Sequence, residues 1–275
     1  MTTHKKHTRM RKDFCKKKFQ HSLIILGLLC FTNVNLAWAN GGDIVVENPI
    51  ESGKKLSNYK KTKYKKDATR LALRLLSENS DFSKMDATVP LEMVNSIYNA
   101  LVAVHHSEIQ AAKTVTRIHK LHTFPSPSVD RFLVIYEREA EWAVPLRLGD
   151  DITDNEKINS LSEKYDLKID SHVEWDDDHN SFNIRAKESM NIASVAKAFS
   201  TIENITLVDT MEPNGDGNDI SVKKMGNGWE INYMIKFDSC ISGCKKKRVW
   251  TFEVTNSGKV NFKGESGDEL PAWMR

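Results

Sequence analysis

Cys240 and Cys244 are the residues of this chain whose type and spacing point most directly to chemistry. They lie in "FDSCISGCKKKRVW", separated by three residues and followed by four cations. Such a pair could serve as a redox centre, as half of a metal site or as a cross-link. Redox catalysts normally use Cys-x-x-Cys at a helix N-terminus, and a structural zinc site needs four ligands. We therefore predict a structural disulfide, with a redox centre activated by the cations as the alternative.

Four histidines invite a metal interpretation, namely His105, His106, His119 and His122. On a single helix running from 91 to 122, positions 105 and 119 would be about 21 Å apart, too far to share an ion. His119 and His122 could share one, but no glutamate completes an HExxH pattern. We predict half-buried or surface histidines, no metal and no cofactor.

Two acidic segments, "DDDHN" (176–180) and "NGDGND" (214–219), have the composition of calcium loops. An EF-hand loop needs glycine at its sixth position and glutamate at its twelfth. Counted from Asn214, these positions hold Asp219 and Met225. We predict polar turns, with adventitious calcium as the alternative.

The segment "GESGD" (264–268) resembles the nucleophile segment of chymotrypsin-like proteases. It departs from that pattern at Glu265 and Asp268, and no "AAHC"-type histidine precedes Ser266. We predict no catalytic residue. An enzyme whose residues converge only in three dimensions remains an alternative.

The first 39 residues predict an export signal. A basic start precedes the nine-residue apolar run "LIILGLLCF", and "AWA" ends at Ala39. A bilayer needs about 20 apolar residues, so a retained anchor is the weaker interpretation, and a lipid anchor at Cys30 is weaker still. We expect cleavage after Ala39 and a secreted or periplasmic protein, with translation starting at Met1 or Met10.

Removal of that signal changes the charge of the chain. The whole sequence carries +3, but residues 40–275 hold 32 cations and 36 anions, a net charge of −4. This charge gives no electrostatic reason to expect a nucleic acid as partner. No later apolar run reaches membrane length, so we expect no membrane-spanning segment after signal removal.

The next part of the chain predicts a leader and a helical region. Residues 40–66 hold seven lysines and few core-forming residues, which predicts a mobile basic leader or, alternatively, a basic arm that holds an anionic surface. Residues 67–124 show apolar residues at helical spacing. Pro125 and Pro127 then predict a boundary, so we expect residues 128–275 to fold without the helices.

Residues 128–212 predict six elements in the order βαββαβ. The strands "RFLVIYE", "LKIDSHVEW", "SFNIRAK" and "ITLVDTM" accompany the helices "TDNEKINSLSEKYDL" and "NIASVAKAFSTIEN". Thr153 and Glu156 have capping-box spacing at the first helix. The order is that of a ferredoxin-like unit, with both helices on one face of an antiparallel sheet. Residues 158–211 also resemble the prodomains and small inhibitors of subtilisin-type proteases, which implies a protein-binding surface.

Residues 213–275 predict an antiparallel β-meander whose central hairpin carries the disulfide. "WEINYMIKF" and "RVWTFEV" alternate as strands on either side of the cysteines. The run "DSCISGCKKKRVWTFEVTNSGKVNFKGESGDELP" resembles the C-terminal end of exported bacterial proteins of unknown function. The predicted fold class is thus α+β, with a helical N-terminal part, a ferredoxin-like unit and a β-meander.

These patterns favour an exported, non-catalytic binding protein, in its sharpest form prodomain-like or protease-inhibitor-like. Its partner would be a protein or an envelope surface, because the edge of an open antiparallel sheet can accept a partner strand. A structural component of the envelope is the alternative from a different class.

Overall fold

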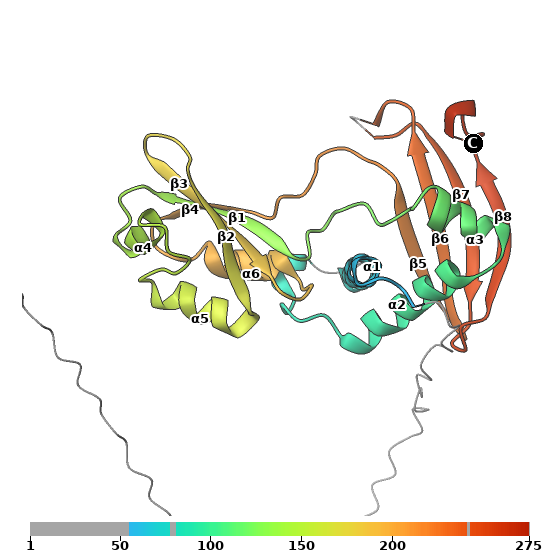
Figure 1. The fold of residues 1–275 in the computed structure, drawn as a ribbon, viewed down its shortest axis with the longest axis horizontal. Helices are drawn as coiled ribbons and strands as arrows, with labels where there is room; N and C mark the ends of the chain where they lie inside the picture. The colour runs from blue at the N-terminus through green and yellow to red at the C-terminus, as the bar shows by residue number, and fades with distance from the viewer. Residues whose placement is uncertain (1–54, 78–80, 241–242, 275) are drawn as a thin grey trace, which may run out of the picture. The chain divides into compact units, whose positions relative to one another are not determined.

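A computed structural model describes residues 55–77, 81–240 and 243–274 of the chain. N-terminal helices precede two four-stranded antiparallel sheets, which confirms the α+β class (Figure 1). The export signal predicted for residues 1–39 lies outside the described residues. Within the described ranges, no helix has both the length and the hydropathy needed to cross a membrane.

The helical part consists of α1 (Asn58–Leu76), α2 (Leu91–His106), the short α3 (Gln110–Lys113) and a π-helical segment (Thr114–Ile118). Ser57 caps α1 by accepting a hydrogen bond from the Lys60 amide. The helix therefore begins nine residues before the predicted start of the helical region at Asp67, because Tyr64 extends its buried face beyond Ala68 and Leu71. A helix from 91 to 122, considered above for the histidines, is also not formed, since α2 ends at His106.

Sheet B is the predicted β-meander, with strands β5 (Asp219–Met225), β6 (Gly228–Phe237), β7 (Lys246–Val254) and β8 (Val260–Gly267) in that order. Alternate residues of β6, among them Ile231, Tyr233 and Ile235, are buried in one core together with Leu71 and Leu101 of the helices. The helical region and the meander therefore share a core. This differs from the expectation that residues 128–275 fold without the helices, because the apolar face of the sheet is covered by α1 and α2.

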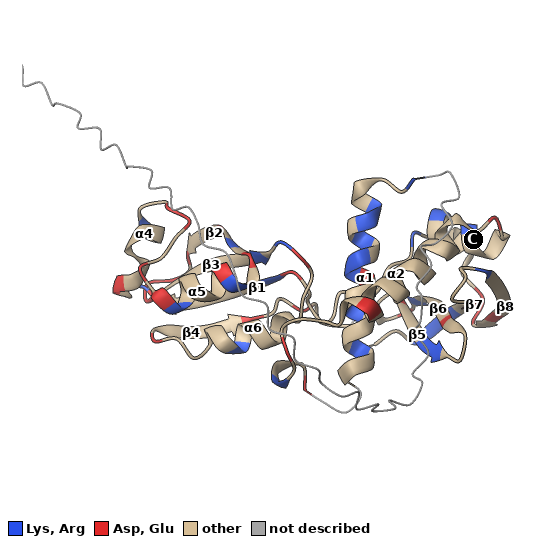
Figure 2. Ribbon diagram, turned by 90° about the horizontal axis from the view of Figure 1, so that it is seen from below, with Lys and Arg blue, Asp and Glu red and all other residues tan. Residues whose placement is uncertain are grey.

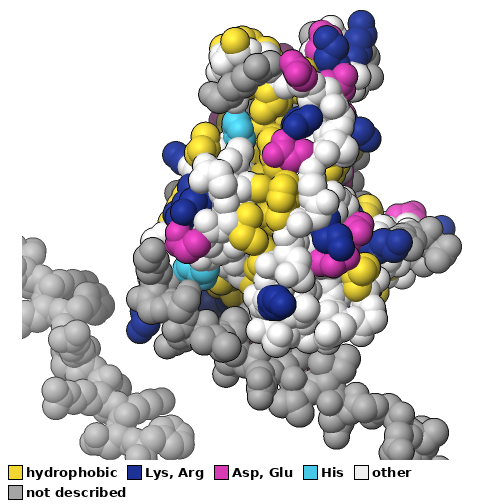
Figure 3. Space-filling view, turned by 90° about the vertical axis from the view of Figure 1, so that its right-hand side faces the viewer, with side chains coloured by type: hydrophobic (Ala, Val, Ile, Leu, Met, Phe, Trp, Pro, Cys, Tyr) yellow, Lys and Arg dark blue, Asp and Glu magenta, His cyan; other side chains and the backbone are white. Residues whose placement is uncertain are grey.

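Strand β8 forms the outer edge of sheet B. Its Phe262 contacts the ring of Phe252 in the core but stays 36% exposed, and Trp273 beyond it is 79% exposed. Figure 3, which views the molecule from the side of β8 and the C-terminus in Figure 1, shows a band of hydrophobic side chains flanked by charged ones. Leu270 and Met274 pack back against the core from the C-terminal segment.

Sheet A contains β1 (Arg131–Glu137), β2 (Leu167–Glu174), β3 (His179–Ala186) and β4 (Ile205–Asp209) in the order β2-β3-β1-β4. Helices α5 (Glu156–Tyr165) and α6 (Ile192–Phe199) cover one face of it (Figure 1). That face buries alternate residues such as Val134, Phe182 and Ile184. Two short elements that the sequence did not predict, η4 (Glu141–Ala143) and α4 (Val144–Arg147), follow β1.

The start of α5 differs in detail from the predicted capping box. Asn155, not Thr153, is the N-cap, and its side chain accepts a hydrogen bond from the Ile158 amide. Thr153 instead bonds the Asn159 side chain and accepts from the Asn155 amide. The helix consequently starts two residues later than the box predicts.

Candidate functional site

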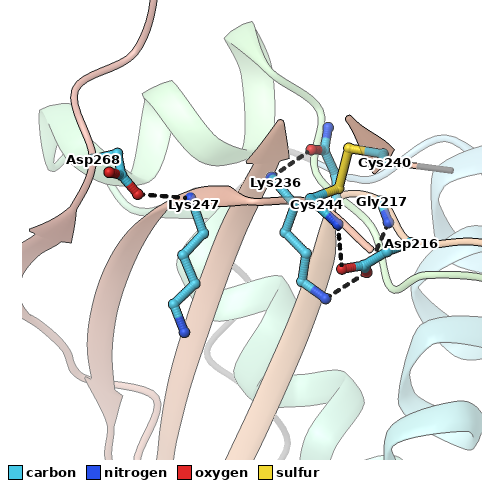
Figure 4. The surroundings of a disulfide bond; sticks show 8 residues. Asp216, Gly217, Lys236, Cys240, Cys244, Lys247 and Asp268 are labelled. Atoms are coloured by element: carbon cyan, nitrogen blue, oxygen red, sulfur yellow. Dashed lines mark hydrogen bonds and ion pairs between the residues drawn. A yellow bond between two sulfur atoms is a disulfide. The ribbon is translucent and has the colours of Figure 1, made fainter. Parts of the chain in front are cut away.

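The structure contains a disulfide between Cys240 and Cys244, at the end of the β6–β7 hairpin. Asp216 lies beside it and accepts hydrogen bonds from the Lys236 ammonium (2.7 Å), the Gly217 amide (2.8 Å) and the Cys244 amide (3.4 Å) (Figure 4). The Lys236 hydrogen bond is the largest cause that holds the pKa of Asp216 below its usual value. A carboxylate at this place connects the disulfide turn to the segment before β5.

Two of the four cations after the disulfide form ion pairs, which bears on the redox alternative. Lys246 pairs with Asp238 (3.5 Å), and Arg248 pairs with Glu265 (2.5 Å). A reactive thiol needs nearby positive charge that is not already neutralised. The surroundings therefore favour a structural role for the disulfide.

A buried polar network joins α1 to the segment that follows the helices. Asp67 accepts hydrogen bonds from His122 Nδ1 (2.5 Å), the Thr123 amide (3.1 Å) and the Thr123 hydroxyl (2.7 Å). Arg70, 7% exposed, donates to Thr123 Oγ1 (2.7 Å) and to the Pro127 carbonyl (2.9 Å). His122 and Thr123 thus donate to the Asp67 carboxylate, Arg70 donates to Thr123 and Pro127, and the network joins α1 to residues 122–127.

An Asp–His pair is also the part of a catalytic triad that orients a general base. A triad requires a nucleophile at the second ring nitrogen. In the part of the chain that the structure describes, no serine or cysteine is hydrogen-bonded to His122, and the Thr123 hydroxyl is held by Asp67 and Arg70. The pair therefore has the geometry of a structural contact.

Two of the four histidines considered as metal ligands, His105 and His106, have rings 5.4 Å apart. His105, His119 and His122 each have a partner elsewhere in the protein. His105 Nδ1 bonds the Tyr64 hydroxyl (3.0 Å), the His119 ring lies 5.9 Å from that of Trp250, and His122 is bound to Asp67. Burial lowers the pKa of His119. Across residues 55–77, 81–240 and 243–274, no group of three His, Cys, Asp or Glu residues is arranged to hold a metal ion.

The two acidic segments form turns whose oxygens bind donors of the protein itself. Asp176 accepts from the amides of Asp178 and His179 (2.9 and 2.7 Å). Asp219 accepts from the Phe124 amide (2.7 Å) and pairs with Arg74 (2.9 Å). These carboxylates act as turn and cap acceptors, which is the polar-turn interpretation.

Ser266, the residue suggested by the protease-like segment, lies within β8 opposite Val249. The neighbouring Asp268 accepts a hydrogen bond from the Lys247 amide (3.0 Å). His172 and His179 belong to strands of sheet A. Residues 264–267 therefore take part in the pairing between β7 and β8, and neither His172 nor His179 belongs to this sheet.

The face of sheet A opposite α5 and α6 carries an apolar row. Strand pairing aligns Val173 with Ser181, Ser181 with Ile135, and Ile135 with Leu207, so the row crosses all four strands. Val173 and Leu207, at its two ends, are 53% and 51% exposed. Neither of the two hydrophobic cores includes these residues. We call the face of sheet A that carries this row the free face; the ends of the row are exposed, whereas Ile135 (8% exposed) and Ser181 (3%) in its middle are buried.

A shallow hollow of about 130 Å³ lies at one end of the free face. Its lining includes Arg131, Asp170, Asn183, Arg185 and Met211. The Asn183 amide donates to Ser171 (2.9 Å), while its buried Oδ1 has no hydrogen-bond partner among the described residues. A buried acceptor without a partner is rare in folded proteins. The free face thus offers apolar side chains and one unmet acceptor.

Sequence reasoning predicted each strand of this face but not which strands lie at the edges. It also missed the Asp67 network, although a signal was present: Asp67 lies three residues after Tyr64 and four before Leu71, on the apolar face of α1. A charged residue at such a position must find a buried partner.

Comparison with protein-family models, with curated proteins and with solved structures finds no match to this chain.

Proposed function

We propose that this chain is an exported, non-catalytic binding protein that captures an extended segment of a partner protein along strand β4. The observation that carries the proposal is the composition of β4, "ITLVD", as an edge strand. Among the strands that the structure describes, only β1 pairs with it, so the backbone groups on its other side are available to a partner strand.

The other three edges of the described sheets are protected. β2 carries Lys168, Asp170 and Glu174 and a β-bulge between Ile169 and Ser171. β5 has two lysines just before its last residue, and β8 carries Lys263 and Glu265. Charges and bulges are the usual means of keeping an edge from pairing with another chain. β4 also has an irregularity, because its pairing with β1 skips Thr206. It differs from the other edges in charge, since its single charged residue stands at its end.

The free face supplies side-chain contacts for the same partner. A strand added beside β4 would place alternate side chains next to Leu207, which is about half exposed, whereas Ile135 beyond it is already buried. Main-chain hydrogen bonds would supply affinity, and these side-chain contacts would supply selectivity for apolar residues at every second position.

The nature of the partner is proposed from the arrangement of sheet A. Its strand order and its two helices on one face support a ferredoxin-like unit. The likeness to prodomains of subtilisin-type proteases makes such a protease the partner to test first. A structural role in the envelope and an enzymatic role remain the alternatives, and the export itself rests on the N-terminal sequence pattern.

Two matched substitutions test the proposal. Leu207→Lys places a charge on β4, whereas Val173→Lys places the same charge at the other end of the same row, at nearly equal exposure. Inhibition of a subtilisin-type protease by the purified exported chain is measured for both variants. Because burying a leucine contributes about 1.5–3 kcal/mol, Leu207→Lys should weaken inhibition about tenfold or more. Val173→Lys should change it less than about twofold.

Thermal unfolding of both variants provides the control for folding. Equal melting temperatures with a selective loss in Leu207→Lys support strand addition at β4. Equal losses in the two variants, or no inhibition by the parent chain, would overturn the proposal. Sedimentation of the parent chain with envelope fragments, unaffected by Leu207→Lys, would favour the structural alternative instead.

A further inference from the structure

We infer that a hollow at the N-terminal end of α1 binds a small phosphate-type anion, at a site separate from the free face of sheet A. The hollow has a volume of about 390 Å³. Its lining includes Lys55, Ser57, Lys60, His105, His106 and Arg117. It therefore gathers side chains from the start of α1, the end of α2 and the π-helical segment.

The charge of the lining carries the inference. Lys55, Lys60 and Arg117 are basic residues, and among the described residues no Asp or Glu lines the hollow. The nearby Glu108 pairs with Lys113 (2.8 Å) and more distantly with Arg117 (3.5 Å), so one carboxylate is shared between two cations. An anion is the ligand that reduces the mutual repulsion of such a lining.

The Arg117 guanidinium is held in place for this role. Its Nη2 donates to the His105 carbonyl (3.2 Å), which ties the π-helical segment to the end of α2. A guanidinium has five donors in a fixed planar arrangement and binds phosphate oxygens well. Donors of Arg117 beyond those used by His105 and Glu108 can therefore face an anion in the hollow.

The first turn of α1 adds to the positive potential. It contains Lys60 and Lys61 and no acidic residue, as Figure 2 shows by the blue segments along α1. Cations at a helix N-terminus oppose the helix dipole and destabilise the helix. An anion bound beside Ser57 and Lys60 would offset the repulsion between these cations and the helix dipole. It would also interact favourably with the positive N-terminal end of the dipole of this 19-residue helix.

His105 makes the site sensitive to protonation. Burial first, then the nearby cations, lowers its pKa to about 4. The groups that face it are Lys60, Tyr64, His106, Arg117 and His122. An anion in the hollow would offset the cations and raise the pKa of His105, so anion binding would be accompanied by proton uptake. Affinity should then rise as the pH falls from 6.5 towards 4.

The size of the hollow limits the ligand. A volume of this order lies at the small end of ligand pockets, which suits a small phosphorylated molecule and excludes the bulk of a macromolecule. The phosphate could belong to a free molecule or to a lipid headgroup, and pyrophosphate and anionic vesicles distinguish these two sources.

The test is calorimetric titration of the exported chain with pyrophosphate. Lys60→Gln removes one lining cation and should weaken binding about tenfold, as expected for a charge-assisted hydrogen bond. Lys61→Gln is the matched control, since it makes the same charge change one residue along the same exposed turn and does not line the hollow. It should change affinity less than about twofold.

Sulfate, which keeps its charge between pH 7.5 and pH 5, serves for the pH measurement. Tighter sulfate binding at the lower pH, lost in His105→Gln, supports the site. Equal effects of Lys60→Gln and Lys61→Gln would indicate diffuse attraction to the helix and overturn it. Saturable binding to phosphatidylglycerol vesicles that Lys60→Gln weakens and Lys61→Gln does not would identify a lipid headgroup as the source of the phosphate. Binding of neither these vesicles nor pyrophosphate at about 10 mM would overturn the site.

Discussion

Replacing Asp67 by alanine should destabilise this protein far more than the loss of an exposed ion pair. The Asp67 side chain is 3% exposed and accepts three hydrogen bonds from His122 and Thr123. Alanine would leave these donors without their acceptor. It would also remove the carboxylate 3.9 Å from the buried Arg70 guanidinium.

The expected loss follows from these contacts. A buried donor left unsatisfied costs about 1–3 kcal/mol, and removing one partner of a buried charge pair costs about 3–5 kcal/mol. These two costs concern the same few groups and are not added, so we expect Asp67→Ala to lower the free energy of unfolding by about 3–5 kcal/mol. This is a large part of the 5–15 kcal/mol that typically stabilises a protein. Asp67→Asn keeps an acceptor for Thr123 and should cost only about 1–2 kcal/mol.

Urea unfolding at pH 7, followed by tryptophan fluorescence, measures these differences. Trp229 and Trp250 lie in the core that α1 covers and report on it directly. The control is Asp170→Ala, which breaks an ion pair with Arg185 that is about half exposed on both sides and should cost less than about 1 kcal/mol. If Asp67→Ala lowers the free energy of unfolding no more than Asp170→Ala does, the reasoning about the network is wrong.

Three further predictions concern the disulfide, the buried histidine and the shared core. Replacing Cys240 and Cys244 by serine should lower the free energy of unfolding by about 2 kcal/mol, because the bridge joins residues only four positions apart; fast-alkylating thiols in the purified native protein would support the redox alternative instead. In the folded chain the pKa of His105 is lowered to about 4, so between pH 6.5 and about 4 the unfolded chain binds more protons at His105 than the folded chain. The free energy of unfolding should therefore fall as the pH falls through this window, and His105→Gln should flatten that part of the pH profile. A fragment of residues 128–275 should not form sheet B cooperatively, since Ile231 and its neighbours lose their cover; cooperative unfolding of sheet B in this fragment, followed at Trp229, would contradict the shared core.

Local patterns in the sequence were sufficient to predict most elements of the fold. The alternation in "WEINYMIKF" and "RVWTFEV" determines which residues share a face of a strand, because successive side chains of a strand point to opposite sides. The two cysteines lie in the turn between these strands, so their pairing also follows from neighbouring residues. The order of elements in residues 128–212 was readable for the same reason, since each depends on a period within a short window.

The candidate sites were beyond the reach of such patterns. Leu207 reads as an ordinary apolar strand residue; only strand pairing shows that β4 has a single neighbour and that Leu207 lies on the uncovered face. The hollow beside α1 brings Lys60 together with Arg117, 57 positions later in the chain, and no local period relates the two.

The boundary at Pro125 and Pro127 shows the same limit most clearly. The prolines do interrupt the helical pattern. However, arginines of α1 donate hydrogen bonds to this segment, Arg70 to the Pro127 carbonyl and Arg74 to the Ser126 carbonyl. The sequence by itself determined the elements, the apolar face of each and the cysteine turn. Tertiary structure alone decided that α1 and α2 cover sheet B, because an apolar face specifies that it must be buried but not which face it is buried against.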